Sequence, residues 1–193
     1  MMKPINQLIN WISEERQHGV INPQQAVLST TTSDAIPHAR VVAVREINED
    51  GLLFFTQKGT RKVVELQINP RAAMTFWFEV LQREVIIEGT VNALLAEENE
   101  RYWSSYPREA QIRFHSYAAT SSQPISSKMQ LEEKKRTIEK HYHGKELPMN
   151  EFYCGFRFVP QRLIFYAYRT DELSDVDEYL LSEKQWIKRC LSP

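Results

Sequence analysis

The chain has 193 residues, enough for one domain with a sizeable core, and its net charge of −1 gives no general attraction to nucleic acid or an anionic membrane. Apolar residues make up 42% of it, and no apolar run approaches the ~20 residues of a membrane helix. Cys154 and Cys190 stand far apart in no metal-binding spacing, so we expect a reduced, cytoplasmic protein without a metal site.

The chain begins with a predicted helix over residues 4–18, where Ile5, Leu8, Ile9 and Ile12 recur at helical spacing. A strand is predicted at 26–32. Residues 40–62 then predict a hairpin followed by a helix.

In this hairpin, Val41–Val44 and Leu52–Phe55 are apolar runs on either side of the turn signal Asn48–Gly51. Thr60 suits the N-cap of a helix that begins with Arg61 and Lys62. Two cations are unfavourable at that end of a helix unless an anion binds there, since the end already carries partial positive charge. The segment therefore predicts a phosphate site, and the alternative is a solvated Arg-Lys pair on a helix face.

The strand that holds Arg40 also holds Arg45. Strict alternation of side chains places Arg40 with Val42 and Val44, and turns Arg45 to the opposite face. The two arginines could serve one ligand only near a bulge, a strand end or a subunit interface.

The remaining segments predict a small antiparallel barrel with flanking helices, a mainly β fold. We expect a single domain over residues 1–193, with its barrel at 26–95 and 152–189 and a helical insert at 96–144. The expected strands, in order, are 72–79, 83–95, 152–159 and 162–168, with a closing hairpin of 179–181 and 186–189. The expected helices of the insert are 96–106, a short one from 108, and 128–143. Residues 118–127, rich in Ser, Thr and Pro, are expected to form a loop.

The sequence resembles the pyridoxamine 5′-phosphate oxidase family of FMN-binding split barrels. That family shows Arg-x-Val-x-x-Lys, a hairpin with Gly, Phe-Tyr-Thr, and Ser-Arg-Lys before a helix. The matches here run in order over nearly the whole chain: Arg40 to Arg45, Phe54-Phe55-Thr56, Thr60-Arg61-Lys62, Asn69 to Ala73, Glu88-Gly89, Tyr102, Pro107-Arg108, Ser122 to Ser126, Gly155-Phe156-Arg157 and Arg189 to Pro193.

The resemblance implies FMN as cofactor and a homodimer with the flavin at the subunit interface. The positions that match flavin-contacting residues are Arg40, Val41, Val42, Arg45, Phe55, Thr56, Arg61, Lys62, Glu84, Ser121, Ser122 and Tyr166. Among these, Arg61 and Lys62 match the pair that binds the flavin phosphate. Glu84 replaces a glutamine, and a carboxylate cannot donate a hydrogen bond unless it is protonated.

The substrate side departs further from the family. Arg45 and Tyr102 keep substrate-binding positions, but Tyr106 stands where the family has an arginine and Ala110 where it has a serine. Residues 172–176 replace an Arg-Leu-His-Asp-Arg segment, so that Glu172 and Val176 take the places of its two arginines. An Arg-to-Glu exchange adds repulsion beside a phosphate dianion.

The resemblance therefore implies an FMN-dependent oxidase like pyridoxamine 5′-phosphate oxidase with an altered substrate pocket, in which we identify no catalytic residue. A phenazine-pathway-like flavin oxidase would fit the missing arginines. The alternatives are a non-catalytic flavin-binding protein and a structural dimer without flavin.

Overall fold

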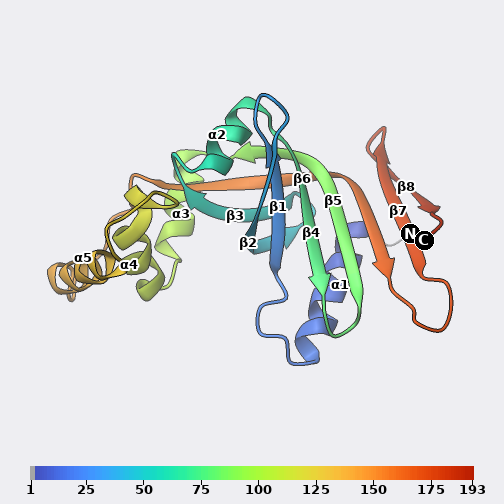
Figure 1. The fold of residues 1–193 in the computed structure, drawn as a ribbon, viewed down its shortest axis with the longest axis horizontal. Helices are drawn as coiled ribbons and strands as arrows, with labels where there is room; N and C mark the ends of the chain where they lie inside the picture. Colours follow the sequence, from blue (N-terminus) through green and yellow to red (C-terminus); the bar gives the residue numbers. More distant parts are fainter. Residues whose placement is uncertain (1–2) are drawn as a thin grey trace. The chain divides into compact units, whose positions relative to one another are not determined.

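The computed structural model describes residues 3–193, and residues 1 and 2 of the predicted domain lie outside the described part. The helices are α1 (Pro4–Gln17), α2 (Arg61–Ile68), α3 (Ala96–Ser104), α4 (Arg108–Tyr117) and α5 (Lys128–His141), with a short 3-10 turn, η1 (Ala118–Thr120). The strands are β1 (Gln25–Thr31), β2 (Pro37–Asn48), β3 (Gly51–Gln57), β4 (Arg71–Phe78), β5 (Arg83–Ala93), β6 (Tyr153–Ala167), β7 (Asp175–Ser182) and β8 (Gln185–Cys190). Figure 1 shows these elements along the chain.

The strands form one sheet in the order β3-β2-β1-β4-β5-β6-β7-β8. A further pairing of β3 with β6 closes the first six strands into a barrel, and the registered neighbours run antiparallel. The protein is therefore mainly β with flanking helices, and the predicted fold class is confirmed.

The chain separates into two compact units. Unit 1 comprises residues up to 54, 65–92 and 156–193, and unit 2 comprises residues 55–64 and 93–155.

Unit 1 holds most of the barrel, whose interior follows from alternating apolar residues. Leu28, Met74, Phe76 and Ile87 point inward and are fully buried. The helix α1 packs on this unit through Trp11, which meets Phe78 and Phe165 edge to face.

Unit 2 has its own aromatic core. Trp103, Phe114 and Tyr153 are buried together, and the Nε1 of Trp103 donates to the carbonyl of Leu147 at 3.0 Å. The charged helix α5 contributes no buried residue, which agrees with its polar sequence.

One predicted element was wrong. Residues 152–159 and 162–168 were expected to form two strands, but the structure has one continuous strand, β6. Pro160 lies within it, just before the pairing with β7 that begins at Arg162. Because proline removes a ladder donor, it suggested a break that the structure does not have.

The closing hairpin is confirmed, since β7 pairs with β8 from Asp177–Cys190 to Ser182–Gln185. None of the helices over the described residues is long and apolar enough to cross a membrane.

Candidate functional site

The start of helix α2 gathers hydrogen-bond donors in unit 2. The Nζ of Lys62 donates to the hydroxyl oxygens of Thr56 at 3.0 Å and Thr60 at 3.4 Å. Both threonines are buried, whereas Arg61 is exposed. We call Thr56, Thr60, Arg61 and Lys62 the donor cluster.

Thr60 occupies the N-cap position as predicted, because its carbonyl accepts from the amides of Val63 and Val64. Its hydroxyl does not cap the helix, however, but donates to the carbonyl of Gln57 at 2.8 Å. Arg61 and Lys62 are thus the first two residues of α2, where the helix end carries partial positive charge. Two cations at such an end suit an anion.

The predicted serine loop joins the same segment. The hydroxyl of Ser121 donates to Oε1 of Gln57 at 3.1 Å, which links the loop to the strand that ends with Thr56 and Gln57. Ser122 has a φ of +62°, a backbone conformation that is uncommon for a residue other than glycine. Its side chain is exposed. Gln57, which the sequence reasoning missed, holds this loop.

Phe55 lies in an aromatic cluster of unit 2 with the predicted Tyr102 and Tyr106. Its ring stacks on Tyr153, with centroids 5.2 Å apart and planes at 8°, and meets Tyr102 at 5.1 Å. Tyr106 lies 6.2 Å from Tyr153. A Cβ on Gly155 would fall 2.4 Å from the ring of Phe55, so this glycine leaves the space that the ring fills.

Sequence reasoning missed Tyr153, whose ring contacts come from residues between about 40 and about 100 positions away in the chain. The nearest feature that the sequence analysis identified is Gly155, two residues after Tyr153, which belongs to the family match.

In unit 1, the guanidinium of Arg40 is engaged within the protein. It donates to the hydroxyl of Thr30 at 2.6 Å and to the carbonyl of Leu28 at 3.2 Å, and it lies 3.5 Å from the carboxylate of Glu65. Burial would raise the pKa of Glu65, but hydrogen bonds from Thr30 and His38 and the charges of His38 and Arg40 outweigh it and lower this pKa. Glu65 thus ties α2 to β1 and β2.

The neighbours of Arg40 on β2 alternate as expected, with Val41 61% exposed and Val42 buried. The register between β2 and β3 shifts between Val44 and Glu46, so Arg45 lies at a β-bulge. Arg45 is half-buried, and its Nη1 atom is buried. The period-two rule that assigned Arg40 and Arg45 to opposite faces therefore does not extend to Arg45, because a bulge re-aims the side chains of its strand.

Glu84 and Tyr166 share a neighbour in unit 1. Tyr168 stacks on Tyr166, with centroids 4.2 Å apart, and its hydroxyl donates to Glu84 at 3.4 Å. Burial and the charge of Glu84 raise the pKa of Tyr168. Tyr166 also lies opposite the buried Val176 in the β6–β7 register.

The predicted residues thus fall into two groups, each described within its own unit. Unit 1 holds Arg40, Val41, Val42, Arg45, Glu84 and Tyr166, and unit 2 holds Phe55, Thr56, Arg61, Lys62, Tyr102, Tyr106, Ser121 and Ser122. Within residues 3–193, no group of three or more His, Cys, Asp or Glu side chains is placed to hold a metal ion.

Comparisons with known proteins agree with one another. A family model described as pyridoxamine 5′-phosphate oxidase matches residues 12–140. Proteins named pyridoxine/pyridoxamine 5′-phosphate oxidase are similar over most of the chain. The one from Psychromonas ingrahamii is 33% identical over 190 residues, 98% of this chain and 87% of that protein. The one from Leptospira biflexa is 34% identical over 185 residues, 95% of this chain and 85% of that protein.

Two solved structures share the fold. PhzG from Burkholderia lata, in complex with tetrahydrophenazine-1-carboxylic acid, is 24% identical with a TM-score of 0.88, over 99% of this chain and 93% of that one. A pyridoxamine 5′-phosphate oxidase-related, FMN-binding protein from Nostoc punctiforme is 14% identical with a TM-score of 0.79, over the whole of both chains.

Proposed function

Since the chain belongs to the pyridoxamine 5′-phosphate oxidase family, we propose that it binds FMN and is an FMN-dependent oxidoreductase that acts on a small, flat-ring amine or alcohol. The donor cluster carries this proposal. Lys62 and Arg61 supply cationic donors at the start of α2, and hydrogen bonds to the hydroxyls of Thr56 and Thr60 hold the ammonium of Lys62 within unit 2 itself. Such a set fits the phosphate of FMN.

Bound FMN would supply the redox chemistry, taking a hydride from the substrate and returning electrons to oxygen. In this proposal Arg61, Lys62 and Thr56 hold the phosphate, and the serine loop fastened by Gln57 contributes the hydroxyls of Ser121 and Ser122. The guanidinium of Arg40 binds Thr30 and Glu65. We therefore propose that the flavin contacts of this strand come from the adjacent Val41 and Val42.

We propose that Phe55, in unit 2, contacts the flavin ring. Tyr166 and Glu84, in unit 1, match flavin-contacting positions of the family. Tyr168 holds Glu84 by a hydrogen bond. These assignments rest on matching positions in the family.

The substrate is proposed to be held through aromatic faces more than through a phosphate. Tyr102 packs on Phe55, and Tyr106 packs on Tyr153 and Trp103, so both rings belong to an aromatic group that can stack on a flat ring. Arg45, in unit 1, matches a substrate-binding position of the family. The exposed Glu172 stands at a position where the family has arginine, and its carboxylate would repel the phosphate of a phosphate ester.

The test compares FMN with riboflavin, which lacks only the phosphate. The double variant Arg61→Ala, Lys62→Ala should bind FMN at least about 100-fold more weakly, since each loses a charge-assisted hydrogen bond. Its affinity for riboflavin should change little. Flavin fluorescence titration measures both affinities.

The control is Arg136→Ala, Lys140→Ala, which removes the same charge from exposed positions of α5. Equal FMN affinity in the wild type and the Arg61, Lys62 variant would refute the phosphate site.

We also propose a homodimer with the flavin at the subunit interface. Its support is an apolar outer face, where Val27 and Val41 lie opposite each other on β1 and β2, and Trp77 lies on β4. They are 39%, 61% and 47% exposed, and exposed apolar side chains gathered on one sheet face are typical of an interface.

Val41→Glu should shift the protein from dimer to monomer in sedimentation and weaken FMN binding. Val80→Glu, at an exposed valine in the β4–β5 turn, should do neither. A wild-type monomer that binds FMN tightly would contradict the dimer proposal.

A second candidate, a non-catalytic flavin-binding protein, is favoured by Val176, a buried apolar residue where the family has a flavin-contacting arginine. Flavin retained without reduction by any substrate would distinguish it.

A further inference from the structure

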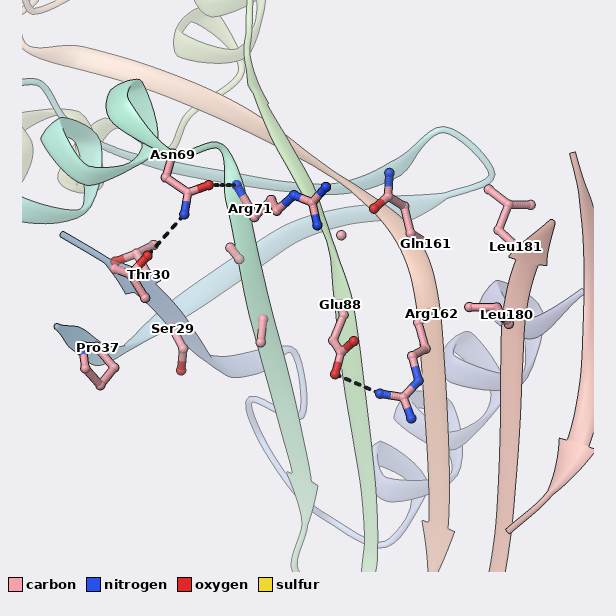
Figure 2. Close-up of a pocket in the computed structure, with 14 residues that line it drawn as sticks. Ser29, Thr30, Pro37, Asn69, Arg71, Glu88, Gln161, Arg162, Leu180 and Leu181 are labelled. Carbon is pink, nitrogen blue, oxygen red and sulfur yellow. Dashed lines mark hydrogen bonds and ion pairs between the residues drawn. The ribbon is translucent and has the colours of Figure 1, made fainter. Parts of the chain in front are cut away.

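Unit 1 contains a cleft that shares no residue with the donor cluster or with the other predicted flavin positions. It has a volume of about 650 Å³, within the range of small-molecule sites. Strands β1, β4, β5, β6 and β7 contribute its walls, and we call it the Arg71 cleft (Figure 2).

One end of the cleft carries an arginine on a fixed backbone. The side chain of Asn69 accepts from the amide of Arg71 at 3.1 Å and donates to the hydroxyl of Thr31 at 3.2 Å. Within residues 3–193 the guanidinium of Arg71 forms no ion pair with a carboxylate. In Figure 2 this guanidinium points toward the side of the cleft where Gln161 lies.

The other charged lining residues neutralise each other. The Nη1 of Arg162 lies 3.0 Å from a carboxylate oxygen of Glu88, and its Nε lies 2.7 Å from the buried carboxylate of Glu178. Among the described residues, Glu88 is the one acidic residue that lines the cleft, and its carboxylate is already paired with Arg162. The charge of Arg71 is therefore left to attract an anion.

The rest of the lining is apolar or neutral. Leu180 and Leu181 form one wall, and Pro37, Ala72 and Ala73 contribute apolar surface elsewhere. A guanidinium on one side of the cleft and two leucines on the opposite side (Figure 2) are suited to a ligand that has an oxyanion at one end and an apolar skeleton at the other.

We propose that the Arg71 cleft is a second ligand site of this protein, for a small organic anion whose carboxylate or phosphate pairs with Arg71 and whose apolar part lies against Leu180 and Leu181. Asn69 fixes the backbone of the arginine, and the amide of Gln161 offers a further donor to the oxyanion.

The test titrates the FMN-saturated full-length protein with benzoate, phenyl phosphate and benzyl alcohol and records NMR spectra. Either anion should shift the side-chain amide signals of Asn69 and Gln161, and the neutral alcohol should not. A response to benzoate alone would identify the ligand as a carboxylate, and a response to phenyl phosphate alone would identify it as a phosphate; both outcomes support the site.

Arg71→Gln should weaken anion binding at least about tenfold, because it removes a charge-assisted pair. Leu181→Asn should weaken it severalfold through the apolar wall. Arg136→Gln, on the exposed face of α5, should leave it unchanged.

Equal affinity of the wild type and Arg71→Gln would overturn the proposal, as would benzyl alcohol binding as tightly as benzoate. Absence of binding by both anions would overturn it too. If Arg71→Gln then also weakened self-association in sedimentation, the cleft would be assigned to contact with a second copy.

Discussion

The segment 55–64 and the C-terminal strands β7 and β8 both carry several charges, but their cations meet different partners. In the first, Lys62 donates to the hydroxyls of Thr56 and Thr60. In the second, cations face carboxylates: Glu178 binds Arg189 and also Arg162 of the neighbouring β6, and Lys188 lies 2.7 Å from Asp177.

The loop before β7 follows the second pattern, with Arg169 bound to Asp175 at 2.9 Å. A hydroxyl does not neutralise the charge of a cation that donates to it, whereas a carboxylate partner does. This difference supports the phosphate site that we propose at the start of α2.

The largest expected effect concerns the paired region. Glu178→Gln should lower the free energy of unfolding by about 2 kcal/mol, because it deprives two arginines of a buried partner that is itself 3% exposed. The value is reduced because Arg162 and Arg189 are 33% and 57% exposed and partly screened by water. Urea unfolding measures it.

Asp175→Asn is the matched control on the same strand, since it breaks an exposed pair and should cost much less than Glu178→Gln. Equal losses in the two variants would show that the buried pairing of Glu178 is not special.

The same carboxylate predicts a pH dependence. Hydrogen bonds from Arg162 lower the pKa of Glu178 below 4.5, and those from Arg189 add to the effect. A lowered folded-state pKa gives stability that is present above the unfolded pKa and is lost as the pH falls through the folded value.

The difference in unfolding free energy between wild type and Glu178→Gln should therefore be constant from neutral pH to about pH 5 and shrink at lower pH. Urea unfolding in a series of buffers measures it. A difference that grows on acidification would contradict the assignment.

A third prediction restores one family residue. Glu172→Arg should lower the concentration of pyridoxine 5′-phosphate needed for half-maximal flavin reduction about tenfold, because repulsion of the phosphate becomes attraction. Anaerobic stopped-flow absorbance measures it.

Glu183→Arg, in the exposed β7–β8 turn, is the control for the change in net charge. An equal improvement in both variants would mean that general electrostatic attraction, and not the position of Glu172, is responsible.

The smallest effect concerns the cysteines. Burial raises the pKa of Cys154 to about 11, although the charges of Lys58 and Lys62 act in the opposite direction. The cations of segment 55–64 should therefore not activate this thiol. Native protein treated with iodoacetamide near neutral pH should be modified at the exposed Cys190 and protected at Cys154, as measured by mass spectrometry. Rapid alkylation of Cys154 would refute its burial.

The sequence predicted most of the barrel because buried strand residues such as Leu28, Met74 and Ile87 alternate with less buried neighbours. It failed at Pro160, where pairing with neighbouring strands outweighs the local preference against proline within a strand. The sequence could not locate the bulge at Arg45 either, since the register of β2 against β3 is set by strand pairing and not by residue type.

For the candidate site, the sequence indicated residue types at motif positions but not their partners. The contact of Lys62 with Thr56 is local and follows from the turn before α2. Glu65 binds Arg40, and Phe55 stacks on Tyr153. Both contacts join segments that are distant in the chain, and such contacts cannot be predicted from a single sequence.

The central claim is that the protein is an FMN-dependent oxidoreductase whose grip on the substrate phosphate has been weakened. Its most direct test is the anaerobic visible spectrum of the FMN-saturated protein during titration with pyridoxamine and, separately, with pyridoxamine 5′-phosphate. We predict that both bleach the flavin band, at half-maximal concentrations that differ by less than about tenfold. Bleaching by the phosphate ester alone would contradict the altered pocket, and a flavin band that neither compound changes would contradict the proposed vitamin B6-like substrate class and favour the non-catalytic flavin-binding protein.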